Sequence, residues 1–186
     1  MIRITLVTSN KAKARDIPKI LGFPINVVNI ELEEIQEVDL AKIAKHKIEE
    51  AYSKIHSPVI IDDVALYIKA WNNFPGPLIK WILKAGGGNA SMLLKMMEGE
   101  KDRRALVRLV IAYHDGNKSH LFFGEDQGKI AHSIRGENGF GWDPVFIPNG
   151  KTKTYGEMSF EEKNKDSHRR QALEKFRKFL KERKVV

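Results

Sequence analysis

The sequence has no cysteine among its 186 residues. Disulfide bonds and thiolate metal sites are therefore excluded, and a reducing compartment is allowed. No apolar stretch approaches the roughly 20 residues that a membrane-spanning helix needs. Arg3 interrupts the only apolar run near the start and no small-residue cleavage site follows it, so we expect no signal peptide. These absences favour a cytoplasmic protein.

Several common catalytic signatures are also missing. The phosphate-binding pattern GxxxxGK[ST] does not occur, and the histidines share no metal-ligand spacing. Nothing marks the base and the orienting acid that a nucleophilic serine needs. We find no repeats, no low-complexity segment and no linker, so we expect one domain over residues 1–186.

What the chain does contain is enough apolar surface for a core and a clear excess of positive charge. Hydrophobic residues make up 42% of it, which excludes global disorder. The net charge of +8 favours anionic partners such as nucleotides, nucleic acids or membrane surfaces. Much of the excess lies in KFRKFLKERK (175–184), where a solvated helix face is the alternative interpretation.

The order of the predicted elements indicates an α/β fold. Alternating apolar residues from Ile2 to Val7 predict a strand, and Ile17, Ile20 and Leu21 recur at helical spacing. Pro18 lies inside that helical segment, so the helix should begin late or be kinked. The remaining segments predict strands at 24–30, 58–61, 104–114 and 119–130, and helices at 39–54, 90–98, after Ser159 and after Asp166 or Ser167. A βαβ start followed by strand pairs predicts a mixed sheet flanked by helices.

The first candidate site is the stretch VTSNKAK (7–13), which joins the first strand to the first helix. Such a junction presents backbone N–H groups at the positive end of a helix and readily binds anions. Thr8, Ser9 and Asn10 add short donors, and Lys11 and Lys13 add charge. The alternative is a capped helix with solvated lysines.

The second candidate site is acidic. Asp62 and Asp63 follow a short apolar strand, which we expect them to end. Because neighbours on a strand point to opposite faces, only one of them should enter a given site. With Glu33, Glu34 or Glu37 from the upstream connection, it could share a Mg²⁺, which prefers hard oxygen ligands. The alternative is a strand end with solvated acids.

The third candidate site is GENGFGWDP (136–144). Its glycines allow close backbone approach, and Phe140 and Trp142 offer flat apolar faces. Asp143 is held extended by the proline that follows it. Stacking on aromatic rings is a common way to hold a base, whereas the alternative is a tight turn with core aromatics.

The fourth candidate site is EEKNKDSHRRQ (161–171), where Lys163, His168 and Arg169 surround a break between two helices. Cations in the first turn of a helix are disfavoured by its dipole. An anionic or carbonyl partner would explain His168 and Arg169 there, and helix-surface charge is the alternative.

Together and in this order, the motifs resemble one family, the inosine triphosphate pyrophosphatases, which hydrolyse deaminated purine nucleoside triphosphates. The resemblance rests on TSNKAK (8–13), EIQ (34–36), DD (62–63), FPGPLIKW (74–81), GFGWDP (139–144) and EEKNKDSHR (161–169), which span nearly the whole chain. It implies an elongated mixed sheet with helices, two lobes around a central substrate cleft, and a homodimer. It also implies Mg²⁺-dependent cleavage between the α- and β-phosphates, which gives a monophosphate and pyrophosphate.

On the matching positions, the resemblance implies a role for each motif. Glu34 and Asp63 would hold Mg²⁺, and Asp63 would orient or deprotonate the attacking water. The phosphates would be contacted by Thr8, Ser9, Asn10, Lys11, Ala12, Lys13, Lys47 and Lys80, and Val64 would be a further substrate contact. The nucleoside would be contacted by Phe140, Gly141, Trp142, Asp143, Lys163, His168 and Arg169. Donors from the last two would pair with the 6-oxo group of hypoxanthine or xanthine but face a donor in adenine.

The sequence also departs from the family pattern. Val64-Ala65 stands where many members have Ser-Gly, which removes a hydroxyl beside the phosphates. Leu78 replaces a common tyrosine, and Asp16 replaces a usual glutamate. The alignment that assigns Lys47 needs a one-residue shift. These departures could weaken activity or move the substrate range.

Two other functions stay open. One keeps the fold but acts on other modified nucleotides, which a nucleotide panel would separate. The other is a basic nucleic-acid-binding protein, which needs a continuous basic surface and salt-sensitive binding. The acidic pair and the GFGWDP segment argue against it, so neither a nucleic acid nor a membrane is the expected partner.

Overall fold

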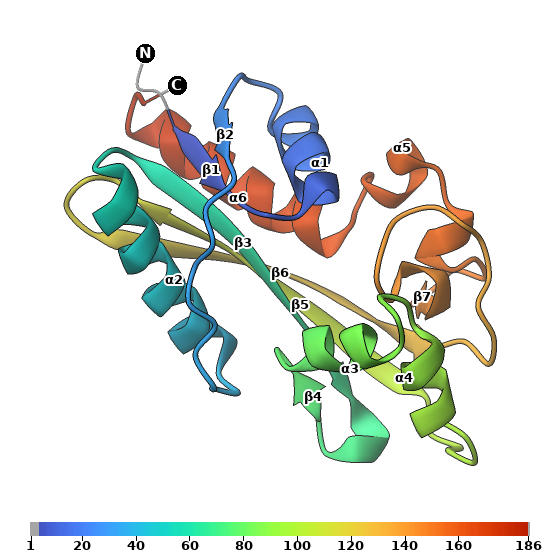
Figure 1. The fold of residues 1–186 in the computed structure, drawn as a ribbon. Coiled ribbons are helices and arrows are strands. Elements are labelled where there is room, and N and C mark those ends of the chain that lie inside the picture. Colours follow the sequence, from blue (N-terminus) through green and yellow to red (C-terminus); the bar gives the residue numbers. More distant parts are fainter. Residues whose placement is uncertain (1–3, 186) are drawn as a thin grey trace. The chain divides into compact units, whose positions relative to one another are not determined.

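The computed structural model describes residues 4–185 and contains a seven-stranded mixed sheet flanked by helices (Figure 1). The strands are β1 (Thr5–Val7), β2 (Asn26–Val28), β3 (Val59–Ile68), β4 (Pro75–Gly76), β5 (Arg104–His114), β6 (Ser119–Ile130) and β7 (Phe146–Pro148). The α-helices are α1 (Lys11–Leu21), α2 (Leu40–Ile55), α3 (Ile79–Ala85), α4 (Ser91–Met96), α5 (Phe160–Lys163) and α6 (His168–Glu182). Short 3₁₀ turns cover Lys69–Trp71, Asp143–Val145 and Tyr155–Glu157.

The sheet combines parallel and antiparallel pairs. Its strand order is β2-β1-β3-β5-β6-β7, and β4 pairs with β3. β1 lies parallel to both of its neighbours, so that Leu6 is opposite Val27 and Ile60. β4 and β7 are antiparallel to β3 and β6. This arrangement confirms the predicted fold class, an α/β fold with a mixed sheet flanked by helices.

The contacts within the chain group it into two compact units. One contains the chain up to Val64, Leu109–Gly124 and the chain from His168 onward. The other contains Ala65–Arg108 and Glu125–Ser167. The single pyrophosphatase domain, the elongated shape and the central cleft implied by the family resemblance stay predictions.

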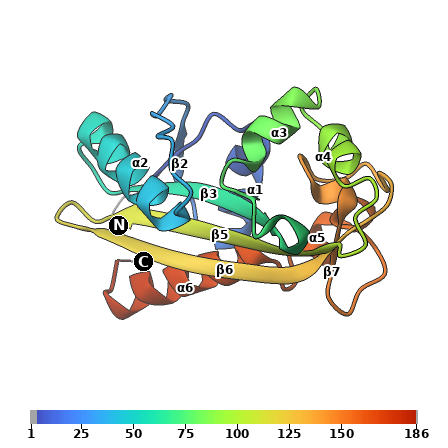
Figure 2. The same cartoon turned by 90° about the horizontal axis from the view of Figure 1, so that it is seen from below.

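In the first unit, α2 and α6 cover opposite faces of the sheet (Figure 2), and α1 packs against α6. The core between these layers contains apolar side chains that are fully or almost fully buried, among them Leu6, Ile17, Ile48, Ile60 and Phe176. Burial of this kind is the main favourable term in folding. It fixes β1, β3 and α1, the elements that carry the first two candidate sites.

The second unit contains β4, α3, α4, β7 and α5. Its core includes Leu66, Ile79, Leu93 and Phe146, and the Phe146 and Tyr155 rings pack with their centroids 5.3 Å apart. Within residues 4–185, no helix is both long and apolar enough to cross a membrane.

Three predicted elements differ from the observed ones. β3 does not end at Asp62-Asp63 but continues to Ile68, because Asp62 is buried with cationic partners. α1 begins at Lys11 and not late, since Asn10 caps it and Pro18 is accommodated inside it. The strand at 24–30 is shortened to Asn26–Val28. In the first predicted strand, Ile2 and Arg3 lie outside the described residues.

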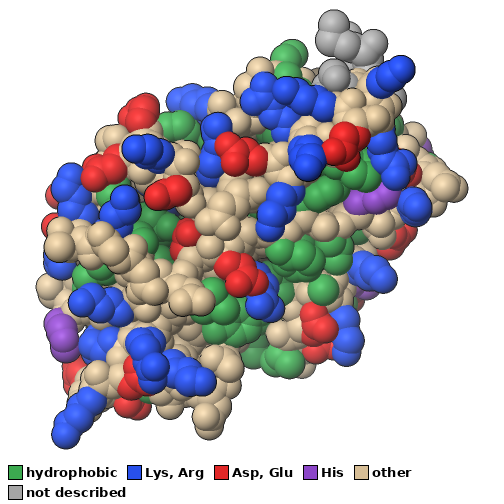
Figure 3. Space-filling model, turned by 180° about the vertical axis from the view of Figure 1, so that it is seen from behind, with side chains coloured by type: hydrophobic (Ala, Val, Ile, Leu, Met, Phe, Trp, Pro, Cys, Tyr) green, Lys and Arg blue, Asp and Glu red, His purple; other side chains and the backbone are tan. Residues whose placement is uncertain are grey.

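The surface charge is mixed on the face seen in Figure 3. There, lysine and arginine side chains are interspersed with aspartate and glutamate and separated by apolar patches. No continuous basic stripe crosses the part of this face that the structure describes.

Candidate active site

The turn between β1 and α1 is a capped helix start. The Asn10 side-chain oxygen accepts hydrogen bonds from the backbone N–H groups of Ala12 (2.9 Å) and Lys13 (3.2 Å). The Thr8 hydroxyl oxygen accepts one from the backbone N–H of Asn10 (3.1 Å). The cap of the capped-helix alternative is therefore present. Its solvated lysines are only half correct, because Lys11 is exposed whereas the Lys13 side chain is 13% exposed and pairs with Asp62. The cap is compatible with an anion site, because the same turn gathers N–H groups and lysines at the positive end of α1.

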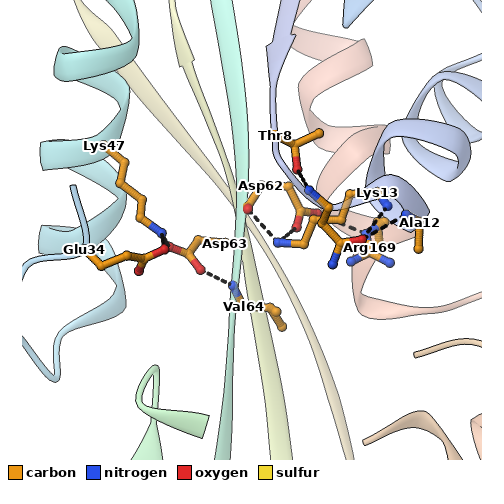
Figure 4. Close-up of polar contacts among 10 residues, drawn as sticks. Thr8, Ala12, Lys13, Glu34, Lys47, Asp62, Asp63, Val64 and Arg169 are labelled. Carbon is orange, nitrogen blue, oxygen red and sulfur yellow. Dashed lines mark hydrogen bonds and ion pairs between the residues drawn. The ribbon is translucent and has the colours of Figure 1, made fainter. Parts of the chain in front are cut away.

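Asp62 and Asp63 point to opposite sides of β3, as strand alternation predicts (Figure 4). Asp62 faces α1 and α6, where Oδ1 lies 2.6 Å from Lys13 Nζ and Oδ2 accepts a hydrogen bond from Arg169 Nε at 3.0 Å. Lys13 Nζ also donates to the Asp62 backbone carbonyl at 2.8 Å. One buried carboxylate thus joins cations from two helices.

Asp63 faces α2 on the other side of the strand. Lys47 Nζ donates hydrogen bonds of 2.8 Å to Asp63 Oδ2 and to Glu34 Oε1. The second Asp63 oxygen accepts from the backbone N–H of Val64 at 2.9 Å. At the position where many family members have serine, the backbone N–H is therefore engaged by Asp63.

The two clusters shift the pKa of their buried members. Burial opposes the charge of Asp62, but Arg169 and Lys13 outweigh it and hold the pKa of its carboxyl well below the ordinary value. Burial likewise opposes the charge of Lys47, but Asp63 and Glu34 outweigh it and raise the pKa of its ammonium. Both groups are therefore charged near neutral pH.

Glu34 and Asp63 fit a magnesium that is shared with a substrate. Both carboxylates lie within hydrogen-bond distance of one nitrogen, so they are close to each other. Magnesium usually takes one or two carboxylates and keeps water or phosphate oxygens for the rest. In residues 4–185, no group of three or more acidic or histidine side chains is placed to hold a metal. A metal here therefore needs oxygens from water or phosphate.

In the second unit, Asp143 holds together the GFGWDP segment. One of its oxygens, Oδ2, accepts from the Phe140 backbone N–H at 2.9 Å and from Lys163 Nζ at 2.6 Å. Lys163 Nζ also lies 4.8 Å from the Tyr155 ring centroid and 5.8 Å from that of Phe140. A Cβ at Gly139 would come within 2.1 Å of Asp143, so only glycine fits there.

The aromatic residues of this segment differ in exposure. Trp142 is buried, as the core-aromatic alternative predicts, and its indole N–H has no hydrogen-bond partner among the described residues. Phe140 is half-buried, which leaves part of its ring surface available. Gly141 adopts a positive φ of 65° between them. Of the two rings, that of Phe140 is therefore the more exposed.

The start of α6 is held close to β6. A Cβ at Gly124 would come within 1.9 Å of the His168 carbonyl oxygen, so a glycine is required at this contact. His168 and Arg169 are both buried, which excludes the interpretation of solvated surface charge for them.

The structure unites the predicted site residues into three groups: Lys13 with Asp62 and Arg169, Lys47 with Glu34 and Asp63, and Lys163 with Phe140 and Asp143. Lys80 lies elsewhere in the second unit, exposed on α3, with Nζ 5.7 Å from the Trp81 ring centroid. Sequence reasoning did not predict that Asp62 pairs with Lys13 and Arg169. The place of Asp62 beside Asp63 on an alternating strand was the available signal.

Comparisons with known proteins agree over nearly the whole chain. The Ham1 family profile matches residues 4–179. A dITP/XTP pyrophosphatase from Thermococcus kodakarensis is 39% identical over 184 residues, which cover 97% of this chain and 98% of the relative. One from Methanosarcina acetivorans is 42% identical over 180 residues, with 95% and 96% covered. The structure of a HAM1 protein from Coxiella burnetii matches with a TM-score of 0.84 at 28% identity, over 98% of this chain and 100% of that one. The chain therefore belongs to the Ham1 family, which confirms the resemblance carried by its motifs.

Proposed function

We propose that this protein is a Mg²⁺-dependent pyrophosphatase for the triphosphates of deaminated purine nucleosides, namely inosine, deoxyinosine and xanthosine. It would release the monophosphate and pyrophosphate and so remove these compounds from the nucleotide pool. The observation that carries the proposal is the pair of carboxylates, Glu34 and Asp63, that meet at Lys47 in a chain whose relatives are named dITP/XTP pyrophosphatases.

The phosphate end requires positive charge, because negative charge shifts between the phosphates in the transition state. Lys13 and the capped turn of Thr8 to Ala12 supply it at the start of α1. Lys47 and Lys80 are the further phosphate contacts that the family resemblance implies, and Val64 is a further substrate contact. When bound, Mg²⁺ at Glu34 and Asp63 would neutralise phosphate charge and polarise the phosphoryl group.

Asp63 is the residue we expect to orient the attacking water and accept its proton. Its Oδ1 is held by the Val64 N–H and its Oδ2 by Lys47, so the carboxylate has a fixed direction. A general base needs this geometry before its pKa matters. Lys47 acts here as the group that holds both acids.

The base end is proposed to use Phe140 for stacking, with Gly141, Trp142 and Asp143 forming the segment that presents it. Lys163, His168 and Arg169 are the donors proposed for the purine. A donor that meets the 6-oxo group pairs with it, whereas it faces the 6-amino group of adenine and is left unpaired. Buried donors left unpaired can give large selectivity.

The test is pyrophosphate release from inosine, xanthosine, guanosine and adenosine triphosphates, each measured with Mg²⁺ and with EDTA. Metal-dependent release that favours the first two nucleotides supports the proposal. Release only from other modified nucleotides would retain the reaction and replace the substrate. No release from any nucleotide would refute the proposal.

The remaining expectations need separate measurements. Sedimentation velocity tests the homodimer, and cell fractionation tests the cytoplasmic location. The nucleic-acid-binding alternative finds no support on the face seen in Figure 3, where acidic side chains interrupt the basic ones. Salt-sensitive DNA or RNA binding without nucleotide hydrolysis would favour that alternative.

A further inference from the structure

Asp62 is a buried carboxylate to which the proposed reaction gives no role. Its side chain is 0% exposed, and its two oxygens have partners from different helices, Lys13 from α1 and Arg169 from α6. Both partners are themselves buried in large part, with 13% and 4% of their side chains exposed. The triad therefore lies inside the first unit and not on its surface.

Burying three charges is costly, and apolar residues of similar volume often stabilise a fold as well or better. Stability alone therefore gives a weak reason for this triad. Geometry gives a stronger one. Lys13 Nζ forms an ion pair with Asp62 Oδ1 and donates a hydrogen bond to the backbone carbonyl of the same residue. The position of Lys13 Nζ is thus set by a single residue of β3.

The same carboxylate sets the position of Arg169. Because Oδ2 accepts from Nε, the Nε edge of the guanidinium is directed toward Asp62 on β3. Lys13 belongs to the proposed phosphate end and Arg169 to the proposed base end. Asp62 contacts both of them.

We propose that Asp62 is a positioning residue that holds the phosphate-contacting Lys13 and the base-reading Arg169 at a fixed separation. This inference rests on the proposed function and adds a specificity-determining residue to it. Since Asp63 is the next residue of β3, one strand sets the places of the metal-binding carboxylate and of both substrate-contacting cations. The phosphates and the base of a bound nucleotide would then both be positioned relative to the same strand.

The test uses Asp62→Asn, which keeps the shape of the side chain but removes its charge. Two properties are measured: the Kd for inorganic triphosphate in the presence of Mg²⁺, and the ratio of kcat/KM for inosine over adenosine triphosphate. We expect the Kd to rise and the ratio to fall, each by about tenfold or more, since Asp62→Asn removes the charge that pairs with both cations. A residue with a merely structural role would lower the active fraction but leave the ratio unchanged.

Asp115→Asn is the matched control. Asp115 lies in the same unit, at the β5–β6 hairpin, where it accepts from the Asn117 and Lys118 backbone N–H groups and pairs with His120. We expect this variant to lose stability while it keeps both the Kd and the ratio. Near-UV circular dichroism verifies that each variant is folded. If Asp62→Asn does not fold, Asp62→Glu is measured in its place. It keeps the charge, displaces both cations by one methylene and should change the same two properties.

The outcomes separate the two proposals. A folded Asp62 variant with the Kd or the ratio of the wild type would overturn the positioning role and leave the proposed function in place. Wild-type protein that hydrolyses none of the nucleotides would refute the proposed function. In that case the triphosphate Kd alone would decide whether Asp62 positions Lys13.

Discussion

Replacing Lys47 with methionine removes the ammonium that joins Glu34 to Asp63 and keeps a side chain of similar length on α2. Each of its two hydrogen bonds is 2.8 Å long. The Asp63 bond is largely buried and should contribute about 1.5–3 kcal/mol, as hydrogen bonds to charged groups do. Glu34 is 37% exposed, so its bond is discounted to about 0.5–1 kcal/mol. We expect Lys47→Met to lower the free energy of unfolding by about 2–4 kcal/mol.

Mg²⁺ should reduce the loss of stability in Lys47→Met. Without Lys47, the two carboxylates face each other uncompensated, and Mg²⁺ can take the place of the ammonium between them. Differential scanning calorimetry in EDTA should show a melting temperature about 4–16 °C below that of the wild type, at about 2–4 °C per kcal/mol for a chain of this size. Saturating Mg²⁺ should recover part of the difference, because a ligand that binds only the folded state stabilises it.

Lys42→Met is the control on the same helix. Lys42 is 67% exposed and pairs with Glu37 at 3.2 Å, so its loss should leave the melting temperature close to that of the wild type. A melting temperature of Lys47→Met equal to that of the wild type in EDTA would contradict the prediction. An equal or smaller rise in melting temperature on addition of Mg²⁺, compared with that of the wild type, would also contradict it.

Three further outcomes are expected. Asp63→Asn should lose nearly all pyrophosphate release while it stays folded, and near-normal turnover would remove Asp63 from the mechanism. Arg169→Ala should erode the preference for inosine over adenosine triphosphate, and an unchanged preference would place base reading elsewhere. Because the pKa of Asp62 is lowered on folding, its contribution to stability is present above its unfolded pKa of about 3.9 and is lost as pH falls below that value. The free energy of unfolding, measured with urea, should therefore decrease more steeply below about pH 4 for the wild type than for Asp62→Asn. Equal slopes would contradict this.

The parts of the fold that sequence predicted well are those with local signals. β5 and β6 begin and end where predicted, because alternation and the turn at Asp115 to Asn117 mark them. α2 also agrees to within a residue, since Asp39 caps it and apolar residues recur along one face. These signals depend only on neighbours in the chain.

The parts that sequence could not predict depend on distant partners. Asp62 and Arg169 are 107 residues apart, and no local sequence pattern around either residue predicts the pairing. Without that pairing, two aspartates after an apolar run indicate a strand end, and for this reason β3 was expected to be short. The pairing of Asp143 with Lys163 and the joining of Glu34 to Asp63 through Lys47 have the same origin. The family resemblance named most of these residues but not their mutual contacts.

The adjacency of Asp62 and Asp63 limits how this chain can change length. β3 is aligned with β1 through Val59 and Ile60, just before the two aspartates. A single-residue insertion or deletion between Ile60 and Asp62 would turn each aspartate to the other face of the sheet. Asp62 would then face α2, and Asp63 would face α1 and α6. A change of length between Ile60 and Asp62 should therefore separate Asp62 from Lys13 and Arg169, and Asp63 from Lys47, in a single step.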